Sequence, residues 1–125
     1  MALGFDRDPA AGGPLVQGFT GRGFSIDGKV YEGLLLTPER AEGWEAPALA
    51  ELSMEHLERV LALDPAPEFL ILGTGPDMAF APRHLVRALK ERGIGVEAMD
   101  SRAAARTWGV LRGEGRWIVA ALMPL

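Results

Sequence analysis

Three short apolar runs in the second half of the sequence each follow a segment whose apolar residues recur at helical spacing. The runs lie at residues 69–72, 96–99 and 117–123, and the helices before them are expected at 54–63, from 82 to Gly93, and from Asp100 or Ser101 to Leu111. Helices that alternate with apolar strands are typical of layered α/β folds, because each helix carries the chain back to begin a neighbouring strand. The sequence therefore predicts an α/β fold with a partly parallel sheet.

The first half of the sequence predicts β-structure around a tight turn. Asp27-Gly28 lies between two β-rich runs, 22–26 and 29–36, and a two-residue Asp-Gly loop favours the turn type that matches strand twist. Residues 37–47 are polar and interrupted by two prolines, so we expect a loop there. The first fourteen residues are rich in proline, glycine and charge and are expected to be loose. At this length, residues 1–125 are expected to form a single domain.

Charge and hydropathy exclude several classes of protein. The net charge of −4 argues against general affinity for nucleic acids, which depends on basic patches. The longest apolar run, 117–124, is far shorter than the ~20 residues that span a bilayer, and residues 1–14 lack the pattern of a signal peptide. We therefore expect a cytoplasmic protein without membrane insertion.

Basic residues gather in the second half of the chain. Residues 1–68 hold twelve acidic and five basic side chains, whereas residues 69–125 hold five acidic and eight basic ones, seven of them arginines. Arginine is favoured at protein interfaces and anion sites, although a solvated surface would explain the same composition. On the last expected helix, arginines lie on the face opposite an apolar stripe. The candidate partner-binding residues are Arg102, Arg106, Gly109 and Arg112.

The strand expected at 69–72 runs into a glycine turn, Gly73-Thr74-Gly75, that resembles the start of a nucleotide-binding site. A dinucleotide fingerprint needs a third glycine three positions later, where Met78 stands, and no phosphate-loop lysine follows. Backbone amides in such a turn can nevertheless hold an anion, with Arg106 or Arg116 as the countercharge. The turn is therefore a candidate ligand site formed by Gly73, Thr74, Gly75 and Arg116, or a turn that requires glycine for steric reasons alone.

Residues for most catalytic chemistry are missing from the sequence. Cysteine is absent, and neither His56 nor His84 has a partner at zinc-site spacing. The three serines lie in the hairpin or at expected helix starts, without the glycines of a nucleophile elbow. We therefore predict no catalytic residues, no metal site and no cofactor.

The C-terminal third, VEAMDSRAAARTWGVLRGEGRWIVAALMP, resembles the signature of a family of small α/β domains. In this family a strand is followed by Met-Asp-Thr, a stretch of small residues, Arg-Thr-Tyr-Asn, Glu-x-Arg and an apolar strand. The segments 99–101, 106–109 and 114–116 of this chain fit those places, and FLILGTG and the Asp-Gly hairpin fit the family's earlier elements. Trp108 stands where the family has tyrosine, and Gly109 where it has asparagine.

The family includes the mitochondrial respiratory complex I assembly factor 3 and many bacterial and archaeal proteins without an assigned activity. The resemblance implies a three-layer arrangement of helices around a mixed sheet, with additional β-structure at the front. It also implies a non-catalytic interaction or assembly module, whose protein partners include respiratory-complex subunits, and a homo-oligomer is compatible with it. Two alternatives stay open: a protein that binds a small anionic ligand or nucleotide at the glycine turn, and an enzyme of unknown reaction.

Overall fold

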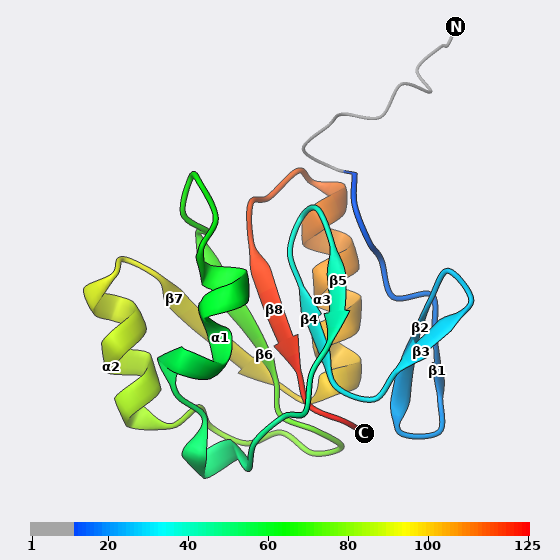
Figure 1. Ribbon diagram of the computed structural model, residues 1–125, viewed down its shortest axis with the longest axis horizontal. Coiled ribbons are helices and arrows are strands. Elements are labelled where there is room, and N and C mark those ends of the chain that lie inside the picture. The colour runs from blue at the N-terminus through cyan, green and yellow to red at the C-terminus, as the bar shows by residue number, and fades with distance from the viewer. Residues whose placement is uncertain (1–11) are drawn as a thin grey trace, which may run out of the picture.

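The computed structural model describes residues 12–125, which form two β-sheets and three α-helices (Figure 1). The strands are β1 (Gly18–Thr20), β2 (Gly23–Ile26), β3 (Lys29–Tyr31), β4 (Leu34–Leu36), β5 (Ala41–Gly43), β6 (Phe69–Gly73), β7 (Gly95–Met99) and β8 (Val119–Leu122). The helices are α1 (Met54–Leu61), α2 (Arg83–Glu91) and α3 (Ser101–Gly113), and a short 3-10 helix lies at Leu49–Glu51.

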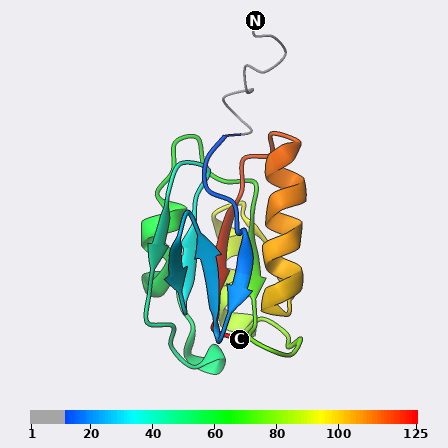
Figure 2. The ribbon, with the colours of Figure 1, turned by 90° about the vertical axis from the view of Figure 1, so that its right-hand side faces the viewer.

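The larger sheet is mixed, as predicted. Its strand order is β5-β4-β8-β6-β7, in which β6 pairs in parallel with β7 and β8 while β4 pairs antiparallel with β5 and β8. The smaller sheet is antiparallel with the order β1-β2-β3, and it stands beside α3 (Figure 2).

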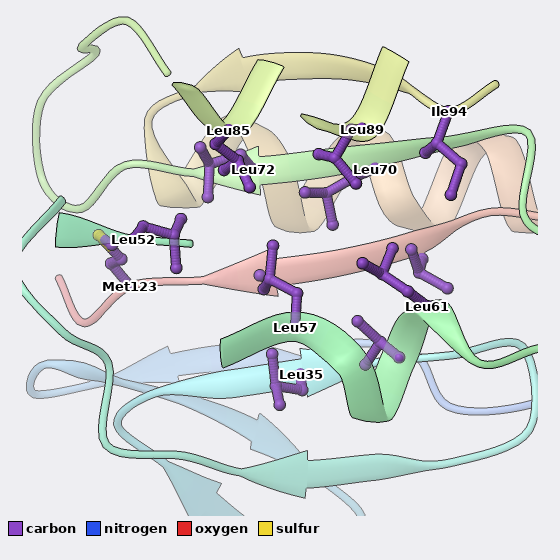
Figure 3. Close-up of a cluster of buried hydrophobic side chains, with 13 residues drawn as sticks. Leu35, Leu52, Leu57, Leu61, Leu70, Leu72, Leu85, Leu89, Ile94 and Met123 are labelled. Atoms are coloured by element: carbon purple, nitrogen blue, oxygen red, sulfur yellow. The ribbon is translucent and has the colours of Figure 1, made fainter. Parts of the chain in front are cut away.

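Both faces of the five-stranded sheet are buried, which gives the predicted three layers. On one face, leucines of α1 and α2 pack against alternate residues of β6 and β8, as Figure 3 shows for Leu57, Leu85 and Leu70. On the other face, Trp108 of α3 and Phe24 of β2 belong to a second cluster with the remaining sheet residues. Strands covered on both sides explain why β6 and β8 read as continuous apolar runs rather than alternating ones.

The predicted hairpin turn is confirmed, but the second run of β-residues divides. Asp27 and Gly28 have φ angles of 49° and 81°, and Ile26 pairs with Lys29 across the two-residue turn. The run 29–36 was predicted as one strand, whereas β3 stays in the small sheet and β4 crosses into the large one. The chain changes sheets at Gly33, where a Cβ atom would lie 2.3 Å from the carbonyl oxygen of Trp44.

The loop predicted for residues 37–47 is wrong, because β5 lies within it and pairs with β4. The Thr37 hydroxyl accepts hydrogen bonds from the amides of Glu39 and Arg40, at 3.1 and 3.0 Å, and this closes a tight turn between the two strands. Strand β1 was not predicted either. Of the segment 1–14 predicted to be loose, residues 1–11 lie outside the described residues, whereas the carbonyls of Gly12 and Pro14 accept hydrogen bonds from α3.

None of the helices within residues 12–125 has the length and apolarity that a bilayer crossing requires.

Candidate functional site: the outer face of helix α3

Helix α3 is held by its first turn and by its inner stripe. The Asp100 carboxylate caps the helix by accepting a hydrogen bond from the amide of Ala103 at 2.9 Å. Ala104 and Trp108 are fully buried against the sheet, as the spacing predicted. The Trp108 indole Nε1 also donates to the carbonyl oxygen of Pro14 at 2.9 Å. These contacts fix which side of α3 faces outward.

The outer face of α3 presents two exposed arginines. Arg102 and Arg106 are exposed, and within residues 12–125 neither forms an ion pair or a hydrogen bond through its side chain. The Arg102 guanidinium lies 5.5 Å from the ring centroid of Phe19, a cation–π distance. A depression of about 220 Å³ lies between β1 and α3, lined in part by Phe19 and Arg106.

Apolar side chains accompany these arginines. Val110 is 61% exposed on α3, and Phe19 is 38% exposed on β1. Gly109 precedes Val110 on the helix, and a Cβ atom there would meet nothing within 4 Å, so packing does not require the glycine. We call Phe19, Arg102, Arg106, Gly109 and Val110 the α3 outer surface. Exposed arginine beside apolar side chains is the composition that protein interfaces favour.

Arg112 does not belong to this surface, and its prediction as a partner-binding residue is corrected here. Its side chain is 1% exposed and donates hydrogen bonds to the carbonyl oxygens of Arg116 and Gly12, at 2.5 and 2.8 Å. Arg112 stands four residues after Trp108, so helical spacing places both on the inner stripe. That spacing is the signal by which the sequence could have identified it as a structural residue.

The candidate ligand turn, Gly73-Thr74-Gly75, is engaged in internal hydrogen bonds. The Thr74 amide donates to the carbonyl of Met99, and the Gly75 amide donates to the Ser101 hydroxyl, both at 2.8 Å. The buried Ser101 hydroxyl in turn donates to the carbonyl of Met123 at 2.7 Å. A Cβ atom on Gly73 would lie 2.8 Å from Ser101 Oγ. The turn therefore joins β6, α3 and the end of β8, and its Thr74 and Gly75 amides do not point to a ligand.

Arg116 is not brought together with this turn. Its guanidinium pairs with Glu68, at 2.8 Å between Nη2 and Oε1, just before β6 begins, whereas the turn follows the end of β6. Five residues of strand separate the two by about 16 Å. The hydrogen bond from Arg116, helped by one from the amide of Trp117, lowers the pKa of the Glu68 carboxyl, and the same pairing raises the pKa of Arg116.

The two histidines have contacts typical of structural residues. The His56 ring Nδ1 accepts from the amide of Ser53 at 3.0 Å, and His84 Nε2 lies 2.8 Å from the carbonyl oxygen of Leu52. Within residues 12–125, no three carboxylate or imidazole side chains gather in a way that would hold a metal ion.

Sequence reasoning missed a set of exposed apolar side chains. Phe19 was within a run not assigned to a strand, and the loop between β6 and α2 exposes Met78 (54%) and Phe80 (85%). The sequence carried one signal for the loop: apolar residues stand between the Gly-Pro-Asp turn and Pro82, where neither a helix nor a strand was expected to bury them. Exposed apolar residues favour contact with a partner over a closed ligand pocket.

Comparison with known proteins identifies close relatives. The chain is 33% identical over 116 residues to a Danio rerio protein named NADH dehydrogenase (ubiquinone) 1 alpha subcomplex assembly factor 3, and it covers 67% of that protein's length. It is 34% identical over 121 residues to an uncharacterised protein of Rhodobacter capsulatus, and the match covers 95% of this chain and 92% of that one.

A solved structure and a family model agree with these relatives. A crystal structure of a Bordetella parapertussis protein superposes with a TM-score of 0.81 at 31% identity, covering 91% of this chain and 98% of the other. Residues 16–123 match the model of a family described as a protein of unknown function, DUF498/DUF598. The match spans most of the chain, including the glycine turn and α3. The chain therefore belongs to the DUF498/DUF598 family.

Proposed function

We propose that this protein is a non-catalytic binding module of the cytoplasm that assists the assembly of a respiratory complex, and that it docks its partner on the α3 outer surface. The observation that carries the proposal is that Arg102 and Arg106 are exposed without an ion pair in residues 12–125, beside exposed Phe19 and Val110. Their charge is left for an acidic or polar surface on a partner.

The relatives support the same class of function. The Danio rerio protein is named for assembly of an NADH dehydrogenase, and the match to it includes most of the present chain. We extend the assembly role in that protein's name to this chain only within this proposal.

A small-ligand function at the glycine turn has weaker support. The amides of Thr74 and Gly75 are both used internally, and Arg116 is paired with Glu68 at the other end of β6. Ligand sites are usually closed cavities with converging polar groups. The α3 outer surface, with its shallow depression and exposed apolar residues, fits a protein partner better.

The experiment that tests the proposal is quantitative native capture of the tagged protein from cells that express it. We expect stoichiometric recovery of NADH dehydrogenase subunits with the wild type, and about tenfold less with Arg106→Glu, because charge reversal at an interface removes an attraction and adds a repulsion. Lys29→Glu serves as the matched control. It makes the same change of charge on β3, the strand of the small sheet that does not adjoin β1.

Two results would overturn the proposal. One is a wild-type capture that contains no respiratory-complex subunits. The other is equal recovery with Arg106→Glu and Lys29→Glu, which would remove the α3 outer surface from the contact. Matching far-UV circular dichroism and melting temperatures for the variants would exclude misfolding as the cause of any loss.

A further inference from the structure

A groove lies on the other side of the molecule, along α2 and the edge strand β7. Two adjoining depressions, each of about 420 Å³, share Val86 and Lys90. The first reaches from α2 to Ile94, just before β7, and to Val96 within it, and the second continues along α2 past Arg87 to Arg83. We call this pair of depressions the α2–β7 groove. Its floor is largely apolar, and Val86 is 40% exposed within it.

The groove borders an open edge of the sheet. Within residues 12–125, β7 pairs only with β6, and residues 95–98 make no backbone hydrogen bond outside that pairing. The carbonyl of Met99 faces β6, since it accepts from the amide of Thr74. Backbone groups alternate in direction along a parallel strand, so those of Val96 and Ala98 point away from β6. They are the donors and acceptors that an added strand would use.

The opposite edge of the same sheet is protected in a way that β7 is not. Strand β5 is three residues long, and its central residue Glu42 pairs with Arg40 and Arg59, at 2.7 and 2.9 Å. Short, charged edges discourage strand addition. Strand β7 has five residues and begins with Gly95, which leaves its backbone open to approach.

Basic side chains line the groove on the helix side. Arg83, Arg87 and Lys90 are exposed, and none of the three has an ion pair or side-chain hydrogen bond within the described part of the chain. Glu91 is the single carboxylate on α2. Because α2 carries these three cations and one carboxylate, its charge favours an acidic occupant of the groove.

We propose that an extended acidic segment of a partner protein adds to the edge of β7 and occupies the α2–β7 groove. Arg83 and Lys90 are seven residues apart, about 10 Å along the helix axis. Two residues that face the same side of a strand and are four positions apart are separated by about 13 Å. Carboxylates at positions i and i+4 of the segment therefore reach Arg83 and Lys90, while an apolar residue at i+2 meets Val86.

Other occupants fit the groove less well. Glu97 is exposed at the centre of β7, so antiparallel pairing of two copies would bring like charges together there. An anionic bilayer would be attracted by the basic residues, but it has no strand to satisfy the backbone groups of Val96 and Ala98. The sites on α2 and α3 belong to different layers, so this inference does not depend on the function proposed above.

Nuclear magnetic resonance titration of the full chain tests the inference with a defined probe. The probe is the capped peptide Thr-Glu-Thr-Val-Thr-Glu-Thr, and its matched control replaces both glutamates by lysine. We expect saturable shifts of the Val96 and Ala98 amides with the acidic peptide and at least tenfold slower hydrogen exchange at those two amides. The Glu97 and Met99 amides, already within the sheet, should exchange slowly with or without peptide.

Variants assign the contact to the groove. Arg83→Glu and Lys90→Glu should each weaken peptide binding about fivefold, the order expected for a partly exposed ion pair that becomes a repulsion. Lys29→Glu, with the same change of charge on β3 of the small sheet, should leave it unchanged. The inference is overturned if the lysine peptide or a backbone N-methylated acidic peptide binds equally well, or if the shifts map outside β7 and α2. It is also overturned if no shift occurs at millimolar peptide, or if only anionic phosphatidylglycerol vesicles perturb these residues.

Discussion

The inner and outer faces of α3 use the same residue type for different purposes. Arg112 on the inner face is buried and donates to the carbonyls of Gly12 and Arg116, which ties the chain before β1 to the end of the helix. Arg106 on the outer face is exposed and has no such partner within residues 12–125. Residue type alone therefore does not define a site on this helix. The position relative to the apolar stripe determines whether an arginine stabilises the fold or remains available for a partner.

The largest expected difference between the faces is in stability. Trp108→Ala removes a fully buried indole and its hydrogen bond to Pro14, and should lower the free energy of unfolding by about 3–5 kcal/mol. Val110→Ala, on the outer face of the same helix, should change it by less than about 0.5 kcal/mol. Urea denaturation of the two variants measures both values, and similar losses would show that the two faces are not distinct.

A second contrast concerns the junction between the glycine turn and α3. Ser101→Ala leaves the Gly75 amide and the Met123 carbonyl without their buried partner, and should cost about 1–3 kcal/mol. Thr107→Ala, which removes a hydroxyl from a half-buried position of the same helix, is the control and should cost less. Thermal denaturation compares them. A Ser101→Ala variant as stable as the wild type would contradict the structural role given to the turn.

Much of this fold follows from local rules that act within a few residues. The Asp27-Gly28 turn, the Asp100 cap and the apolar runs of β6 and β8 are each specified by neighbouring residues, and the structure contains all of them. The strands missed at β1 and β5 are three residues long, too short for a period-2 pattern, and β5 is held by pairing with β4 rather than by its own composition.

The candidate site was predictable only in part. Helical spacing places Arg102, Arg106 and Gly109 on one face, as expected, and the same spacing assigns Arg112 to the other. The approach of Phe19 to Arg102 depends on how β1 packs beside α3, a contact across more than eighty residues. No local pattern reports such a contact. The hydrogen bond from the Gly75 amide to the Ser101 hydroxyl likewise joins residues that are distant in the sequence.

A smaller effect is expected at Arg116, which, unlike Arg106, forms an ion pair with a carboxylate, that of Glu68. Its partner Glu68 has a pKa below the ordinary value, so the pair stabilises the folded state above that ordinary pKa, and the stabilisation is lost as pH falls through the lowered pKa. Arg116→Gln should therefore reduce stability slightly at neutral pH, because the pair is exposed, and should have no effect in acid. Denaturation of Arg116→Gln and of Glu68→Gln measures this stability difference across pH 2–7, which extends about two units to either side of an ordinary carboxyl pKa. A pH-independent difference would contradict the pairing.

The most direct test of the central claim combines stability and capture in one variant. Arg102→Glu/Arg106→Glu reverses both charges of the α3 outer surface. Both side chains are exposed and neither forms an ion pair within residues 12–125, so losing the Arg102–Phe19 contact should lower the free energy of unfolding by no more than about 1 kcal/mol. Native capture by this variant should recover almost no respiratory-complex subunits. Undiminished recovery by a variant of wild-type stability would contradict the account.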